Sequence, residues 1–104
     1  MTKRQTVAKI NDIPNNEARA FPVGERMIAI FNQDGTYHAM DDFCPHMGAS
    51  LAGGWIESGT VACPWHAWRF SLKDGCWLDN PKIIVDIFNV YVVGDEIQVE
   101  FDDE

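Results

Sequence analysis

Short apolar segments of strand length recur along the chain and are separated by turn-forming residues. Val, Ile, Phe and Tyr dominate these segments, and such side chains suit half-buried strands. No window keeps an apolar 3.6-residue period over eleven residues, so we expect little helix. The predicted strands are residues 6–10, 27–31, 36–40, 60–62, 69–72, 76–78, 83–87, 88–93 and 96–101.

Two pairs of these strands have the spacing of β-hairpins. The strands 27–31 and 36–40 flank the turn sequence Gln33-Asp34-Gly35, and the strands 69–72 and 76–78 flank Lys73-Asp74-Gly75. Each turn ends on a glycine, which tolerates the positive φ that such turns require. With turn residues recurring every 8 to 12 positions, the pattern predicts an all-β sandwich or barrel.

Two stretches depart from the strand pattern. Asn11–Arg19 is polar and contains Pro14, so we expect a loose connection there. Cys44–Gly54 is also loop-like, with a proline and three glycines, and it lies between two strand-rich regions. Because it is longer than most connections, we interpret it as an inserted loop.

Composition and charge narrow the possible functions. A chain of 104 residues, 46% of them hydrophobic, has material for one domain with one core. Its 16 acidic and 8 basic residues give a net charge of -8, which argues against nucleic acid and anionic membranes as partners. No signal peptide or stretch of about 18 apolar residues is present, so we expect a cytoplasmic protein.

The candidate chemistry lies in two pairs of cysteine and histidine. Cys44-x-His46 is followed, after 16 intervening residues, by Cys63-x-x-His66. Pro45 and Pro64 come directly after the two cysteines and stiffen the backbone there. Together the pairs offer two thiolates and two imidazoles, so the sequence predicts a metal centre held by two loops.

Two kinds of metal centre remain possible on these residues. Cys₂His₂ is a ligand set for structural zinc, which would make the chain a zinc-stapled interaction module. Zinc sites usually pair Cys with Cys and His with His, with gaps of at least two residues. Mixed pairs instead suit a binuclear cluster in which each loop gives a Cys to one iron and a His to the other.

The two boxes resemble those of Rieske [2Fe–2S] proteins. The resemblance rests on Cys44-Pro-His46-Met-Gly-Ala-Ser-Leu51 and Cys63-Pro-Trp-His66-Ala-Trp-Arg-Phe70, followed by Asp74-Gly75 and Pro81. It extends over roughly residues 6–101, because the flanking strand pattern also matches.

The resemblance implies a Rieske fold, cofactor and ligand set. We expect two packed antiparallel sheets or a small barrel, with an inserted two-loop cluster-binding subdomain at about 42–78 of a single domain spanning 1–104. One Rieske-type [2Fe–2S] cluster per chain is implied. By resemblance, Cys44 and Cys63 bind the buried iron, and His46 and His66 bind the outer, reducible iron.

Departures from the family pattern indicate which class of Rieske protein this is. Respiratory members carry a disulfide between the loops, at positions that are Ala49 and Trp65 here. They also place hydroxyl donors near the cluster, where this chain has Trp68 and Phe70. Donors toward sulfur stabilise the added electron, so we expect a potential at the low end of the Rieske range.

The resemblance further implies an electron carrier with no substrate site of its own. We expect a flavin-dependent reductase or flavoprotein subunit as donor and a redox enzyme as acceptor. The second box and Asp79-Asn80-Pro81 look more like the small subunit of NAD(P)H-dependent nitrite reductase. The alternative is the ferredoxin of a multicomponent aromatic-ring dioxygenase.

Four other features have simpler expectations. We expect Asp41 and Asp42 to be solvated, and His38 to be a surface residue of its strand. Cys76 is predicted to be a small buried hydrophobe beside Trp77. Trp65, between two predicted ligands, is expected to shield the cluster from water, and the alternative is that it forms part of the surface on which a redox partner docks.

Overall fold

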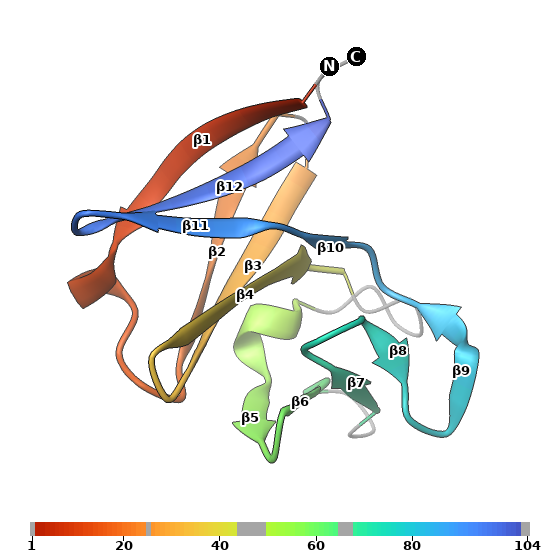
Figure 1. Cartoon of the computed structure of the whole chain (residues 1–104). Helices are drawn as coiled ribbons and strands as arrows, with labels where there is room; N and C mark the ends of the chain where they lie inside the picture. The colour runs from red at the N-terminus through yellow and green to blue at the C-terminus, as the bar shows by residue number, and fades with distance from the viewer. Residues whose placement is uncertain (1, 25, 44–49, 65–67, 103–104) are drawn as a thin grey trace.

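A computed structural model describes residues 2–24, 26–43, 50–64 and 68–102 of the protein. These residues form an all-β architecture of three antiparallel sheets, as Figure 1 shows. Apart from strands they contain two short 3₁₀ turns, η1 (Ile10–Asp12) and η2 (Leu51–Gly53). Within the described part of the chain, no helix has the length and apolar character needed to cross a lipid bilayer.

The first sheet joins the two ends of the chain. Its order is β1 (Thr2–Lys9), β12 (Glu96–Asp102) and β11 (Val90–Val93), all antiparallel. The register between β1 and β12 shifts once, between Thr6 and Ala8. Beginning and end of the described chain therefore lie side by side (Figure 1).

The second sheet contains the first predicted hairpin. Its order is β10 (Ile87–Phe88), β4 (Thr36–Asp41), β3 (Arg26–Gln33) and β2 (Ala18–Val23). The β3–β4 hairpin confirms the pairing expected around Asp34-Gly35. Strand β2 was not predicted. It contains Pro22, which is tolerated because β2 is an edge strand.

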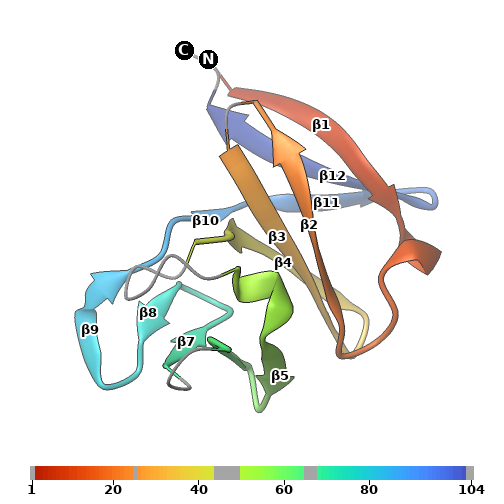
Figure 2. The same cartoon turned by 180° about the vertical axis from the view of Figure 1, so that it is seen from behind.

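The first two sheets pack face to face around a shared core, seen from both sides in Figures 1 and 2. Alternating residues of β3 and β12 point into it, as half-buried strands require. Its buried members are Ala8, Ile13, Val23, Ile28, Ile30, Ala39, Ile97 and Val99.

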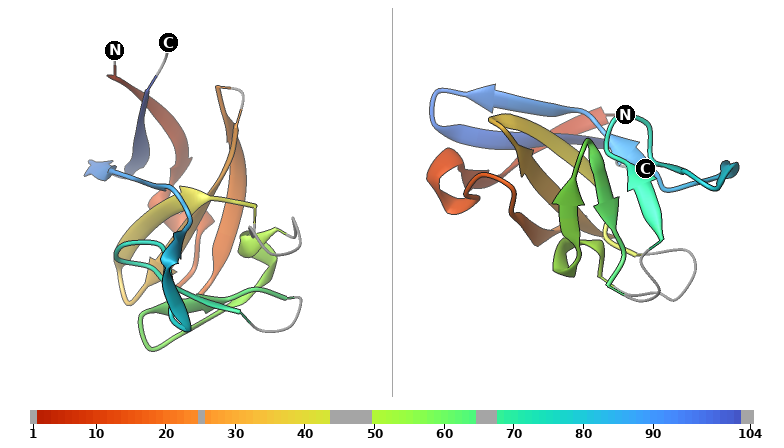
Figure 3. Two further views of the ribbon diagram at one scale, coloured as in Figure 1. Left: turned by 90° about the vertical axis from the view of Figure 1, so that its right-hand side faces the viewer. Right: turned by 90° about the horizontal axis from the view of Figure 1, so that it is seen from below.

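The third sheet is built from one continuous segment inserted between β4 and β10. Its order follows the chain: β5 (Trp55–Glu57), β6 (Thr60–Ala62), β7 (Arg69–Ser71), β8 (Cys76–Trp77) and β9 (Asn80–Ile84). The β7–β8 pairing confirms the second predicted hairpin, and Gly75 has the expected positive φ of 77°. The sheet lies to one side of the other two (Figure 3).

A second core joins the inserted segment to the rest of the molecule. It combines residues of β3 and β4 with residues of β6, β7 and the turns around them: Ala29, Phe31, Met40, Leu51, Val61, Cys63, Phe70, Leu72 and Val85. The prediction of two packed antiparallel sheets with an inserted loop-bearing subdomain is confirmed.

Candidate metal centre

The first predicted ligand loop emerges from the end of β4 and returns at η2. Cys44 and His46 lie outside the described residues, so the structure describes the two ends of the loop only. At those ends Phe43 and Ser50 form an isolated antiparallel bridge. The Leu51 N–H also donates to the Asp42 carbonyl at 2.7 Å. The loop is therefore closed at its neck by backbone pairing.

The side chain of Asp42 lies at this neck. Asp42 is only 7% exposed, which corrects the expectation that it is solvated. Its Oδ1 accepts hydrogen bonds from Ser50 Oγ and from the Ala52 N–H, both at 2.9 Å. Donors arranged in this way satisfy a buried carboxylate, which is otherwise costly to remove from water. The local sequence gave no indication of this, because both donors follow the loop.

The second predicted ligand loop begins at the end of β6. Cys63 is fully buried, and it packs in the same core as Leu51, the residue that ends the neck of the first loop. The Cys63 N–H donates to the Trp68 carbonyl at 2.7 Å, which closes the second loop at its own neck. The predicted ligand His66 lies outside the described residues.

A pair of stacked indoles follows the second neck. The rings of Trp68 and Trp77 lie 3.5 Å apart between centroids and only 6° from parallel. Phe70, which is fully buried, packs at a tilt against Trp68. Trp68 and Phe70, the two positions at which the resemblance places hydroxyl donors in high-potential Rieske proteins, thus carry aromatic rings without a hydroxyl.

Cys63, the one predicted ligand among the described residues, has surroundings that suit a cluster ligand. A fully buried cysteine at the neck of a loop can offer a thiolate in an environment from which water is excluded. The necks of both loops share one core, so each loop starts from a fixed base. Among the described ranges, no three His, Cys, Asp or Glu side chains are gathered to hold a metal ion. Three of the four predicted ligands lie outside those ranges, so the ligand set stays a prediction.

The surroundings of His38 and Cys76 can be compared with what the sequence predicts for each residue. His38 is half-buried, and desolvation lowers the pKa of its imidazole against the opposing effect of a hydrogen bond to the Leu72 backbone. It is therefore not the simple surface residue expected. Cys76 is half-buried on β8, and desolvation together with the Asp74 carboxylate raises the pKa of its thiol. A protonated thiol is a poor nucleophile, which agrees with a packing role.

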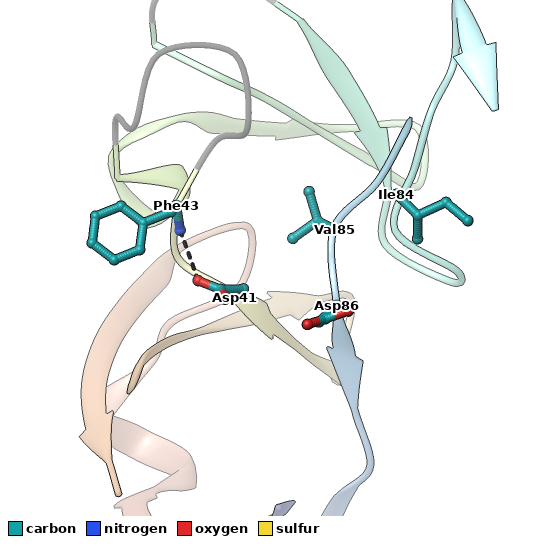
Figure 4. A pocket seen from close by; sticks show the side chains of 5 residues that line it. All are labelled: Asp41, Phe43, Ile84, Val85 and Asp86. Carbon is teal, nitrogen blue, oxygen red and sulfur yellow. Dashed lines mark hydrogen bonds between the residues drawn. The ribbon is translucent and has the colours of Figure 1, made fainter. Parts of the chain in front are cut away.

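A shallow pocket of about 260 Å³ lies beside the first neck. It is lined by Asp41, Phe43, Ile84, Val85 and Asp86, and Figure 4 shows the Phe43 ring pointing away from Val85. The Phe43 N–H donates to Asp41 Oδ1 at 3.1 Å. Arg26 pairs with both carboxylates of the pocket, at 3.5 Å to Asp41 and 3.2 Å to Asp86.

Comparison with known sequences gives one family. Residues 3–97 match the family model of the Rieske [2Fe–2S] domain. The ferredoxin component of an alkene monooxygenase system from Xanthobacter autotrophicus is 30% identical over 94 residues, covering 89% of this chain and 77% of that protein. The ferredoxin subunit of 3-phenylpropionate/cinnamic acid dioxygenase from Shigella flexneri is 36% identical over 93 residues, covering 88% and 87%. Other relatives are far longer: this chain spans 13% of mouse Apoptosis-inducing factor 3, at 34% identity over 78 residues.

Comparison with solved structures gives the same fold. A putative NADH-dependent nitrite reductase small subunit from Mycobacterium tuberculosis superposes with a TM-score of 0.93 at 22% identity, covering 100% of this chain and 99% of that one. The ferredoxin in a complex of oxygenase and ferredoxin of carbazole 1,9a-dioxygenase superposes with a TM-score of 0.83 at 26% identity, covering 92% and 91%.

Proposed function

This chain belongs to the Rieske [2Fe–2S] family, and on that premise we propose that it carries single electrons from a flavin-dependent reductase to a larger redox enzyme. It is an electron-transfer protein whose cofactor is a Rieske-type [2Fe–2S] cluster. The observation that supports the carrier role best is the likeness to ferredoxin components over most of both chains. We treat residues 1–104 as a single domain, with the cluster-binding part at about 42–78.

In this proposal Cys44 and Cys63 hold the inner iron, and His46 and His66 hold the outer one. When bound, such a cluster supplies a site that accepts and releases one electron. Support for this arrangement comes from the backbone pairing at the necks of both loops and from Cys63, whose full burial would keep water away from the inner iron. Because Trp68 and Phe70 offer no hydroxyl toward sulfur, we expect a reduction potential near the low end of the Rieske range.

Two classes of acceptor fit the chain, and we favour an oxygenase. Identities of 30% and 36% over most of both chains relate it to ferredoxins of a monooxygenase and a dioxygenase system. A related fold occurs in a ferredoxin solved together with its oxygenase. The second candidate is the small subunit of a nitrite reductase. It is supported by the high TM-score to such a subunit and by the residue sequence of the second motif, which begins at Cys63.

The cofactor and its ligands can be tested on the purified protein. We expect visible absorbance, equal amounts of iron and acid-labile sulfide, and a rhombic EPR spectrum on reduction. Cys44→Ser and Cys63→Ser should lose all three properties. Cys76→Ser is the matched control, since it removes the third cysteine without touching a predicted ligand. A colourless protein that contains zinc and no sulfide would instead establish the zinc-stapled module.

The acceptor can be tested by rapid mixing. The reduced protein is mixed separately with an oxygenase component and with a sirohaem nitrite reductase large subunit, each from a related system. We expect fast reoxidation by the oxygenase and slow reoxidation by the nitrite reductase. The reverse order of rates would assign the chain to nitrite reduction.

A further inference from the structure

The neck of the first ligand loop contains a buried carboxylate that has no part in the predicted ligand set. Asp42 is one of two polar residues that are buried in the described part of the chain. It lies two positions before Cys44 and directly after the end of β4. A charged group in this position needs a structural reason, because burial without partners is strongly unfavourable.

The carboxylate joins the two sides of the neck. Its Oδ1 accepts from Ser50 Oγ and from the Ala52 N–H, so the hydrogen bonds reach across residues 43–49 to the far side of the loop. The backbone hydrogen bond from the Leu51 N–H to the Asp42 carbonyl is, by itself, a single link between the two sides of the loop. Hydrogen bonds to a charged acceptor are stronger than neutral ones, and three fixed points restrict the loop more than one.

The same residue anchors the neck to the body of the protein. The Asp42 N–H donates to the Met27 carbonyl of β3 at 3.0 Å. On the other side of the neck, Leu51 is fully buried in the core that also contains Cys63. The backbone of Asp42 therefore ties one side of the neck to β3, while Leu51 ties the other side to the core that supports the second loop.

We propose that Asp42 is a positioning residue that holds the two sides of the first neck together and thereby slows loss of the cluster. The inference rests on the ligand assignment of the proposed function. It assigns to the carboxylate a role that the neighbouring Asp41 lacks, because the Asp41 carboxylate pairs with Arg26 and accepts from the Phe43 N–H on its own side of the neck. Residues that orient metal ligands typically change metal affinity by about 10–100-fold when they are removed.

The test compares Asp42→Ala with Asn32→Ala. Asn32 is the other buried polar residue in the described chain, and it lies toward the opposite end of β3 from Met27. Its side chain bonds to the Ile13 carbonyl and the Gly35 N–H, away from both ligand loops. Both variants remove a buried polar group, so both should lower the thermal midpoint. Cluster loss to an iron chelator is followed by visible absorbance at a temperature where every variant stays folded.

We expect Asp42→Ala to lose its cluster about tenfold faster than the wild type. Asn32→Ala should lose it at the wild-type rate despite its lower stability. Equal rates in Asp42→Ala and Asn32→Ala would overturn the inference, because the effect would then follow from stability alone.

Two milder variants keep the test decisive if Asp42→Ala does not accumulate as folded protein. Asp42→Asn retains an acceptor without the charge, and Ser50→Ala removes one of the two side-chain partners. Each should release the cluster faster than the wild type and slower than the full removal, with a changed EPR line shape. Wild-type release rates in both would overturn the inference, whereas a wild type without any cluster would overturn the proposed function itself.

Discussion

At the scale of single residues, Gly54 approaches the backbone of Ala62 more closely than a residue with a Cβ could. A Cβ at this position would lie inside the van der Waals contact distance of the Ala62 carbonyl oxygen. Ala62 directly precedes Cys63, so any shift of the backbone there also moves the neck of the second ligand loop. We expect Gly54→Ala to lower the free energy of unfolding by at least about 2 kcal/mol and to speed cluster loss.

The neighbouring glycine provides the control. A Cβ at Gly53 would meet no atom within 4 Å. Gly53→Ala should therefore change the free energy of unfolding by less than about 0.5 kcal/mol. Urea unfolding of both variants measures the difference, and equal destabilisation would show that the approach to Ala62 is not what constrains this turn.

His38 should make the free energy of unfolding depend on pH. Desolvation holds the pKa of its imidazole below the usual value of 6.5. The unfolded chain therefore binds a proton more readily than the folded one, and stability falls as the pH drops below 6.5. In His38→Gln we expect this contribution to the pH dependence of the free energy of unfolding to be absent. The measurement is the difference in urea midpoint between wild type and variant as a function of pH, and a difference that stays constant would contradict it.

Asp42 and His38 show which residue environments the local sequence could not predict. Both were expected to face solvent, Asp42 because it follows another aspartate and His38 because it alternates within a strand. Their partners come from Ser50 and Ala52 in one case and from Leu72 in the other. These contacts depend on how the inserted segment packs against the rest of the chain. The residues next to Asp42 and His38 in the sequence do not predict that packing.

At the scale of elements, the indole stack couples β8 to the second ligand loop. Trp77 on β8 stacks on Trp68, whose carbonyl accepts the Cys63 N–H. We expect Trp77→Ala to lower the free energy of unfolding by about 2 kcal/mol and to speed cluster loss, because one wall of the neck is removed. Exciton-coupled circular dichroism of the paired indoles should disappear.

Trp55 is the matched control for this prediction. It is a tryptophan of the same sheet, but it lies on the edge strand β5 and is 48% exposed. Trp55→Ala should cost less than about 1 kcal/mol and leave both the dichroism and the rate of cluster loss unchanged. An equal acceleration of cluster loss in the two variants would show that the stacking of Trp77 on Trp68 does not help to retain the cluster.

Elements with local partners were predictable, and elements defined by distant pairing were not. The β3–β4 and β7–β8 hairpins follow from alternation and a glycine turn, and both are present. The predicted strand 88–93 instead divides at Asn89. Ile87 and Phe88 pair with β4, whereas Val90 and its successors pair with β12. Asn89 is the one polar residue in this apolar segment, and the segment changes sheet there because its two halves pair with different strands.

At the scale of the whole molecule, the predicted ligand loops belong to the inserted part, while the two ends of the chain lie together on the first sheet (Figures 1 and 2). The sequence motifs predicted the family, the cofactor and its ligands. Of the four predicted ligands only Cys63 is described, and its full burial agrees with the predicted place on the inner iron. Burial and loop closure come from packing across the two cores, so they appeared only with the structure.

Net charge is the property of the whole molecule that bears most directly on its partners. The chain has a formal charge of -8. Two Fe³⁺, two sulfides and two thiolates sum to about zero, so an oxidised cluster leaves that charge nearly unchanged. An acidic protein attracts cationic partners and repels anionic ones, with a strength that salt reduces. We therefore expect docking on a basic face of the partner enzyme.

Small inorganic oxidants measure this field without a protein partner. The reduced protein should transfer its electron to hexaammineruthenium(III) more slowly as ionic strength rises from about 0.01 to about 0.1 M, and to ferricyanide faster. Asp86→Asn and Asp95→Asn each remove one negative charge, but only Asp86 lines the pocket beside the neck of the first loop. The rate with the cation should therefore fall more in Asp86→Asn. Rates that respond to neither salt nor these substitutions would mean that the acidic surface does not steer electron partners.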